Sequence, residues 1–151
     1  MSSNVHPLFQ DSDNCFTPVC WEGTSLEWRN IIGSPFCALR PGTKHVLTTL
    51  ARYGDAMCND IFPSQREIAF RAGVTAKCVN NCLRRAEYYG WIIRHEQGSR
   101  RGYRRHTYEL CIPAGVFDRI THLKKQFWKP PYDYRIVIQN DEYILEKRLE
   151  A

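Results

Sequence analysis

Apolar residues recur at helical spacing in residues 42–54, GTKHVLTTLARYG. They form the buried stripe expected of an amphipathic helix: Val46, Leu47, Leu50 and Ala51. Thr43 can cap the start of this helix, and Gly54 can end it. The pattern therefore predicts a helix with one face packed into a core.

The residues before this helix are less regular. Residues 1–24 are polar and interrupted by prolines and a glycine, which indicates an irregular arm. Residues 25–32, SLEWRNII, predict a short helix with Ser25 as its N-cap. The GSPF that follows would end it.

Two more helices are predicted from clear start and stop signals. Ser64 is followed by Glu67 three residues later, which is the capping-box pattern, and Gly73 ends this helix. Thr75 caps the next helix, TAKCVNNCLRRAEYYG, and Gly90 suits a left-handed stop. The helix that Thr75 caps carries its own apolar stripe: Val79, Cys82, Leu83 and Ala86.

Strand patterns begin after Gly90. Residues 91–95 predict a strand, and residues 106–112 predict a return strand with alternating side chains. The glycine-containing and arginine-rich residues 96–105 between them predict the tip of a hairpin.

The C-terminal residues predict a mixed segment. A helix is expected over 114–128, a break over KPPYDY and a strand over 134–139. Residues 141–151, DEYILEKRLEA, read as a short amphipathic helix.

The spacing of small and apolar residues in 65–82 is that of a helix-turn-helix. Ala69 is small enough for a second helix to cross over it, Gly73 suits the turn, and Val79 can lock the second helix onto the first. The stretch IFPSQREIAFRAGVTAKCVNNCLRRAEYYGWIIR resembles winged helix-turn-helix domains of phage and plasmid replication proteins and small transcription regulators. The resemblance covers residues 43–112. One departure is Cys82, where that family usually has a larger aliphatic residue.

The resemblance implies an α+β, mainly helical fold, in which three helices are followed by a β-hairpin wing. We expect an N-terminal extension at 1–41, a DNA-binding domain at 42–113 and a C-terminal segment at 114–151.

Positive charge is concentrated in one part of the chain. The net charge of the whole chain is +5. Residues 84–106 carry seven arginines and two glutamates, so this segment alone has a net charge of +5. A local basic stretch on a folded element is typical of proteins that bind polyanions.

In the family that the chain resembles, the third helix enters the major groove of double-stranded DNA. The positions of this helix that would read bases are Thr75, Ala76, Lys77, Asn80, Asn81 and Arg84. The expected contacts to the DNA backbone come from the start of the preceding helix and from the wing: Ser64, Gln65, Arg100, Arg101, Tyr103, Arg104 and Arg105. Two alternatives are that the wing arginines are only a solvated tip, and that Arg85 pairs with Glu87 or faces solvent.

Other chemistries have little support in the sequence. The seven cysteines include no CxxC pair, and Cys78 and Cys82 are best explained as core residues, so we expect free thiols, no metal and no cofactor. There is no phosphate-binding glycine loop and no carboxylate cluster with metal spacing, so we expect no enzyme activity. No signal peptide or membrane-spanning run occurs, which favours a cytoplasmic, nucleoid-associated protein.

The sequence therefore predicts a sequence-specific double-stranded DNA-binding protein. Our first interpretation is a transcriptional regulator of a phage, plasmid or mobile element. The alternatives are a replication initiator or accessory protein that binds origin repeats, and a winged helix that docks an acidic protein partner. The apolar residues of 134–149 predict either a homodimer contact or a tail that folds back onto its own domain.

Overall fold

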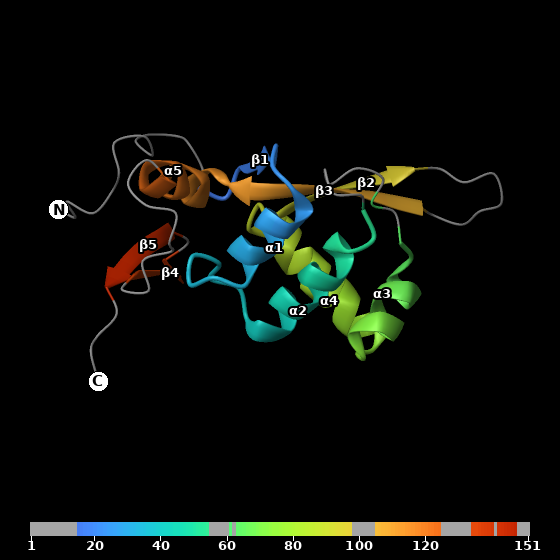
Figure 1. The fold of residues 1–151 in the computed structure, drawn as a ribbon. Helices are drawn as coiled ribbons and strands as arrows, with labels where there is room; N and C mark the ends of the chain where they lie inside the picture. Colours follow the sequence, from blue (N-terminus) through green and yellow to red (C-terminus); the bar gives the residue numbers. More distant parts are fainter. Residues whose placement is uncertain are drawn as a thin grey trace.

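A three-stranded antiparallel sheet lies across the upper part of the molecule in Figure 1, with most of the helices beneath it. The computed structural model describes residues 15–54, 61, 63–97, 105–124, 134–140 and 142–147. Within these residues the chain has five helices and two small antiparallel sheets, which confirms the α+β class. The larger sheet has the strand order β1 (Pro18–Cys20), β3 (Arg105–Pro113), β2 (Ile92–Gln97); the smaller one pairs β4 (Tyr134–Gln139) with β5 (Glu142–Lys147).

Helix α1 (Ser25–Ile32) begins at Ser25, the residue that was predicted to be the N-cap just before the helix. Thr24 is the N-cap, and it forms a complete capping box with Glu27. Ser25 is instead the first helical residue; it is buried, and its hydroxyl donates to the carbonyl of Ala51 at 3.1 Å. The prediction of Ser25 as the cap is therefore wrong, because both Thr24 and Ser25 can cap a helix and only Thr24 has Glu27 three positions later.

Helix α2 (Pro41–Ala51) also has different ends from those predicted. It starts at Pro41, whose fixed φ and missing amide hydrogen suit the first turn of a helix. Thr43 is buried within this helix and does not cap it. The helix ends at Ala51, with Arg52 as the C-cap, three residues before the predicted stop at Gly54.

Helices α3 (Gln65–Ala72) and α4 (Ala76–Tyr88) confirm the predicted boundaries. The Ser64 hydroxyl oxygen accepts a hydrogen bond from the amide of Glu67, and Thr75 does the same for the amide of Cys78. Gly73 closes α3 with a φ of 72°, in the left-handed region that glycine enters without strain. These local signals fix the angle at which the chain leaves α3 and enters α4.

Strands β2 and β3 form the predicted hairpin. β2 begins at Ile92, one residue later than predicted, and pairs with β3 so that Ile92 lies opposite Leu110. Gly90, just before it, has a φ of 86°, as expected for the predicted stop. Three residues of the predicted tip, Glu96, Gln97 and Arg105, belong to the strands instead, and the rest of it, 98–104, lies outside the described residues.

The N-terminal arm is less irregular than predicted. β1 pairs antiparallel with β3, so that Cys20 lies opposite Cys111. Phe16, just before β1, is buried in the same hydrophobic core as the helices. A short strand that pairs with a distant segment leaves no periodic pattern of its own in the sequence, and so the arm could not be recognised as part of the sheet.

After β3, helix α5 (Ala114–Lys124) follows at once, as predicted, and the rest of its predicted length lies outside the described residues. The helix predicted over 141–151 is wrong, because residues 142–147 form β5 and pair with β4. Asn140, between the strands, has a φ of 52°. Asparagine tolerates the left-handed backbone of a tight turn, so Asn140 suits the connection between β4 and β5 despite the helical spacing of the segment.

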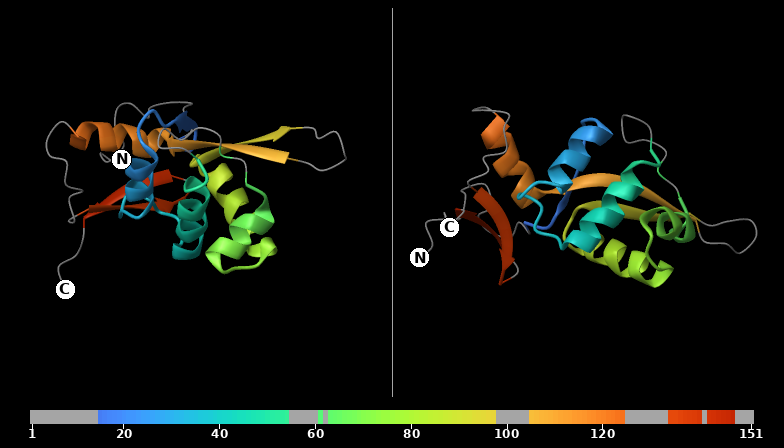
Figure 2. Two further views of the ribbon diagram at one scale, coloured as in Figure 1. Left: turned by 45° about the vertical axis from the view of Figure 1, so that its right-hand side comes forward. Right: turned by 60° about the horizontal axis from the view of Figure 1, so that its bottom comes forward.

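The β4–β5 hairpin packs on the chain's own core. Ile136 and Tyr143 are buried in the main hydrophobic cluster. The amide of Ile136 donates to the carbonyl of Pro35 at 2.9 Å, and the Tyr143 hydroxyl donates to the carbonyl of Tyr89 at 3.0 Å. In both views of Figure 2, β4–β5 lies at the end of the molecule opposite to the far end of β2–β3. The described residues of 134–147 therefore fold back onto their own domain, which is one of the two arrangements expected for this tail.

A single core joins the segments on either side of α2–α4. Trp28 of α1 is fully buried, and its indole nitrogen donates to the carbonyl of Cys111 at 2.9 Å. The cluster extends from Phe16 to Tyr143. Among the described helices, none combines the length and apolar character that crossing a membrane requires.

Candidate nucleic-acid interface

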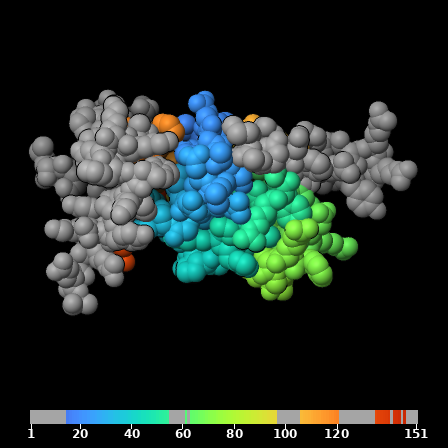
Figure 3. Space-filling model, viewed as in Figure 1, coloured from blue at the N-terminus to red at the C-terminus, as the bar shows by residue number. Residues whose placement is uncertain are grey.

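Helix α4 has one buried face and one polar face. Its predicted stripe is confirmed, with four residues buried: Val79, Cys82, Leu83 and Ala86. Of the six predicted base-reading residues, Asn80 is partly buried and five are exposed: Thr75, Ala76, Lys77, Asn81 and Arg84. Lys77, Asn81 and Arg84 are four and three residues apart, so they form a row along one side of the helix. Figure 3 shows α3 and α4 as the green, lower right part of a continuous surface.

The start of α4 is open to solvent and free of negative charge. Thr75 caps the helix through the amide of Cys78 at 3.1 Å, and Thr75, Ala76 and Lys77 are all exposed. There is no acidic residue in the first turn. The remaining amides and the positive end of the helix dipole therefore favour an anion such as a phosphate.

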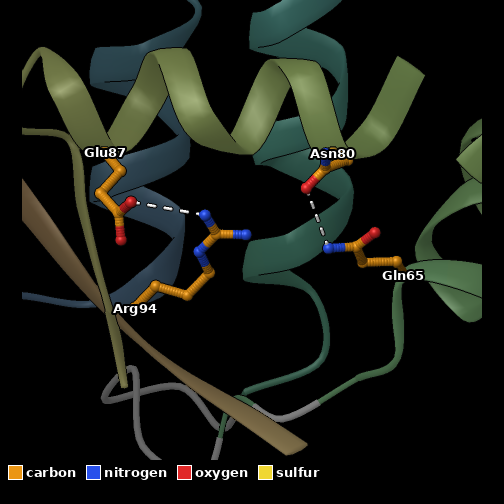
Figure 4. Close-up of polar contacts among 4 residues, drawn as sticks. All are labelled: Gln65, Asn80, Glu87 and Arg94. Carbon is orange, nitrogen blue, oxygen red and sulfur yellow. Dashed lines mark hydrogen bonds and ion pairs between the residues drawn. The ribbon is translucent and has the colours of Figure 1, made fainter. Parts of the chain in front are cut away.

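Two of the predicted DNA-contacting residues touch each other. The side-chain amide of Gln65, at the start of α3, donates to Oδ1 of Asn80 on α4 at 3.4 Å (Figure 4). This distance is long for a hydrogen bond, so the contact is weak. It directs Asn80 toward the start of α3 and leaves the amide nitrogen of Asn80 and one oxygen lone pair for other partners.

Glu87, the acidic residue of α4, is held by a strand. Its carboxylate pairs with Arg94 of β2 at 3.4 Å (Figure 4). The alternative of an Arg85–Glu87 pair is therefore not what the structure shows. Arg84 and Arg85 are both exposed, and no ion pair joins either of them to an acidic side chain within the described residues. Within the part of the chain that the structure describes, the positive charge of α4 is thus not neutralised by an ion pair.

The other predicted backbone contacts divide into two groups. Ser64 is exposed, but its hydroxyl caps α3 through Glu67, with Oγ 3.1 Å from the amide nitrogen. Four of the wing residues lie outside the described residues: Arg100, Arg101, Tyr103 and Arg104. Arg105 begins β3, where its backbone pairs with Gln97.

The two cysteines of α4 are packing residues. Cys82 is buried and Cys78 is partly buried. Burial, more than any other cause, raises the pKa of the Cys82 thiol, which favours its neutral form. The small thiol thus fills the place where the resembled family has a larger aliphatic side chain.

Helix α3 carries an exposed aromatic residue, Phe70, that is not among the predicted DNA-contacting residues. Phe70 is 89% exposed, although large apolar side chains are usually buried. On the same helix, Arg71 lies over the ring of Tyr53 at 5.0 Å from the centroid, while Arg66 is exposed. Phe70 lies two residues after the buried Ile68 and therefore off the buried stripe of α3. This spacing alone could have predicted from the sequence that Phe70 is exposed.

The chain matches no protein-family model, no curated protein and no solved structure.

Proposed function

We propose that this chain is a winged helix-turn-helix protein that binds double-stranded DNA in a sequence-specific manner. In this proposal α4 enters the major groove and β2–β3 is the wing. The order of α2, α3, α4 and a β-hairpin supports it, together with the left-handed turn at Gly73. The observation that carries the proposal is the exposed row of Lys77, Asn81 and Arg84 on a helix whose one acid is engaged elsewhere.

The residue types on this face suit base reading. Asn80 and Asn81 can each form two hydrogen bonds to adenine, whereas Lys77 and Arg84 can bond to O6 and N7 of guanine. Each good pair of this kind contributes about 1–3 kcal/mol of discrimination against the wrong base. The amides at Ala76 and Lys77 would hold a phosphate and so fix the register of the helix in the groove.

The wing would supply contacts of a different kind. We propose that Arg100, Arg101, Arg104 and Arg105 meet phosphates or a narrow minor groove, where positive charge is favoured without base-specific hydrogen bonds. The base-reading and backbone-binding groups would then come from two separate surfaces, α4 and the hairpin.

Selection of bound sequences from a random duplex pool tests the proposal. We expect an enriched motif and an affinity that falls steeply with salt. Asn81→Ala should relax the preference at one position of the motif, while Asn30→Ala, an exposed asparagine on α1, should leave it unchanged. A pool without enrichment at moderate salt would refute sequence-specific binding.

Within this proposal the protein acts as a transcriptional regulator of a phage, plasmid or mobile element. The selected motif should then occur within a promoter and change the output of a reporter placed behind it. A motif found only as repeats at a replication origin, with no effect on transcription, would assign the DNA-binding activity to replication instead.

A further inference from the structure

The outer face of the β1–β3–β2 sheet gathers a set of metal-ligating side chains away from α4. Cys20 Sγ lies 3.3 Å from Oε2 of Glu109. The ligand atoms of Cys20, Glu109 and Cys111 all lie within 4.8 Å of one another. On the next strand, Nε2 of His95 lies 3.3 Å from Oε1 of Glu109. Four side chains with ligand chemistry thus come from three different strands.

The pairing of the strands explains why these side chains meet. Cys20 lies directly opposite Cys111, and Glu109 is two residues from Cys111, so all three point to the same face of the sheet. His95 lies opposite Thr107, which places it on that same face beside Glu109. The arrangement is set by the backbone register and not by a chance approach of long side chains.

The backbone of Cys111 is held on both sides. Its amide donates to the carbonyl of Trp91 at 2.9 Å, and its carbonyl accepts from the indole of Trp28 at 2.9 Å. Directly after β1, the amide of Trp21 donates to the carbonyl of Leu110 at 2.9 Å, which fixes the position of Cys20 beside it. A ligand set on such rigid strands loses little conformational freedom when an ion binds.

Two thiols, a carboxylate and an imidazole form a donor set that suits zinc. Thiolate and imidazole select zinc-class cations, whereas calcium and magnesium require mostly oxygen ligands. Two ligand atoms of a tetrahedral zinc are about 3.5–4 Å apart, given bond lengths of about 2.0–2.3 Å. The ligand atoms of Cys20, Glu109 and Cys111, all within 4.8 Å of one another, are therefore at most about 1 Å too far apart. Small side-chain rotations of the exposed Cys20 and Glu109 can close this gap.

We propose that Cys20, Glu109 and Cys111 bind one zinc-class divalent cation, with His95 as the fourth ligand. The ion would tie the segment that precedes α1 to the base of the β2–β3 hairpin. It would stabilise the fold, because a cation that binds only the folded chain shifts the equilibrium toward it. The site does not depend on DNA binding, and it departs from the sequence expectation of no metal.

Titration of the reduced, full-length protein with Co²⁺ tests this site. We expect one equivalent to produce a thiolate-to-cobalt charge-transfer band and the visible bands of tetrahedral Co²⁺, with displacement by Zn²⁺. Cys20→Ser and Glu109→Gln change exposed side chains, and each should lower the Co²⁺ affinity at least about tenfold. Zn²⁺ should raise the thermal midpoint of the wild type and not that of Cys20→Ser.

Cys78→Ser is the matched control, since it removes a thiol from α4 and leaves the proposed ligands intact. It should keep the spectrum and the affinity of the wild type. The proposal is overturned if reduced wild-type protein gives no charge-transfer band, if Cys20→Ser binds Co²⁺ as tightly as the wild type, or if Cys78→Ser abolishes the band. Circular dichroism of each variant without metal shows whether the fold is kept. A Cys20–Cys111 disulfide that forms in the presence of Zn²⁺ under reducing conditions would likewise overturn it.

Discussion

Arg94 of β2 pairs with Glu87 of α4, with Nη2 3.4 Å from Oε1. The Arg94 side chain is only 14% exposed, whereas Arg84, which lies on α4 one turn before Glu87, is exposed. The two arginines therefore have different surroundings. Arg94 joins the end of a helix to a strand, whereas Arg84 lies exposed on α4 and, among the described residues, forms no ion pair.

This difference predicts that removing the charge of Arg84 affects DNA binding, whereas removing that of Arg94 affects thermal stability. Arg84→Ala should weaken binding to the selected duplex by about 1–3 kcal/mol, roughly five- to 150-fold, with little change in thermal stability. Arg94→Ala should lower the thermal midpoint slightly, because a partly exposed ion pair contributes at most about 1 kcal/mol. The measurements are fluorescence anisotropy and thermal unfolding.

Arg135→Ala serves as the control for net charge in this comparison. Arg135 is exposed on β4, where it pairs with Glu146 at 2.8 Å, far along the chain from α4. If Arg135→Ala weakens duplex binding as much as Arg84→Ala does, the effect is general electrostatics, and the role of Arg84 in base reading is refuted.

The contact between Gln65 and Asn80 predicts a separation of affinity from specificity. Asn80→Ala should relax the preference for adenine at one position, because its side-chain amide is lost. Gln65→Ala should lower the affinity only a few-fold and keep the preference, since the 3.4 Å contact merely orients Asn80. Competition with duplexes that carry each of the four bases at that position measures both. An unchanged preference in Asn80→Ala would rule out its role as a base reader.

The elements that the sequence predicts well are those whose signals are local. Ser64, Thr75 and Gly73 each act within one turn of helix, so their effects can be read from neighbouring residues. The buried stripe of α4 likewise follows from spacing alone, and with it the exposed face that makes up the candidate site.

The features that the sequence does not reveal depend on distant partners. The hydrogen bond from Trp28 to the carbonyl of Cys111 spans 83 residues, and nothing in either segment specifies the other. The same applies to Cys20 opposite Cys111, which places β1 in the sheet. Because strand register sets which side chains share a face, the cluster on the outer face could be found only in the structure.

Two glycines with similar φ angles should respond differently to alanine. At Gly73, φ is 72° and an added Cβ meets nothing within 4 Å, so Gly73→Ala should cost only the strain of a left-handed alanine, about 1–2 kcal/mol. At Gly90, φ is 86° and the Cβ would overlap the carbonyl of Phe16, which adds a packing cost of about 1–3 kcal/mol. Urea unfolding measures both. Equal losses would show that Phe16 does not pack against Gly90 in solution.

The buried thiol of Cys37 predicts how stability depends on pH. Cys37 is 3% exposed, and burial raises its pKa from 9.0 to about 11. A thiol whose pKa is higher in the folded than in the unfolded state contributes stability that is fully present below the unfolded pKa and is lost as the pH rises through the folded pKa. The free energy of unfolding should therefore fall between about pH 9 and about pH 11. Cys37→Ala removes the thiol and should lose less stability over the same interval, although tyrosines and lysines still titrate there. Urea unfolding of both proteins at about pH 8 and about pH 11 gives the loss of unfolding free energy for each. Equal losses in the two proteins would show that Cys37 is not buried as a neutral thiol.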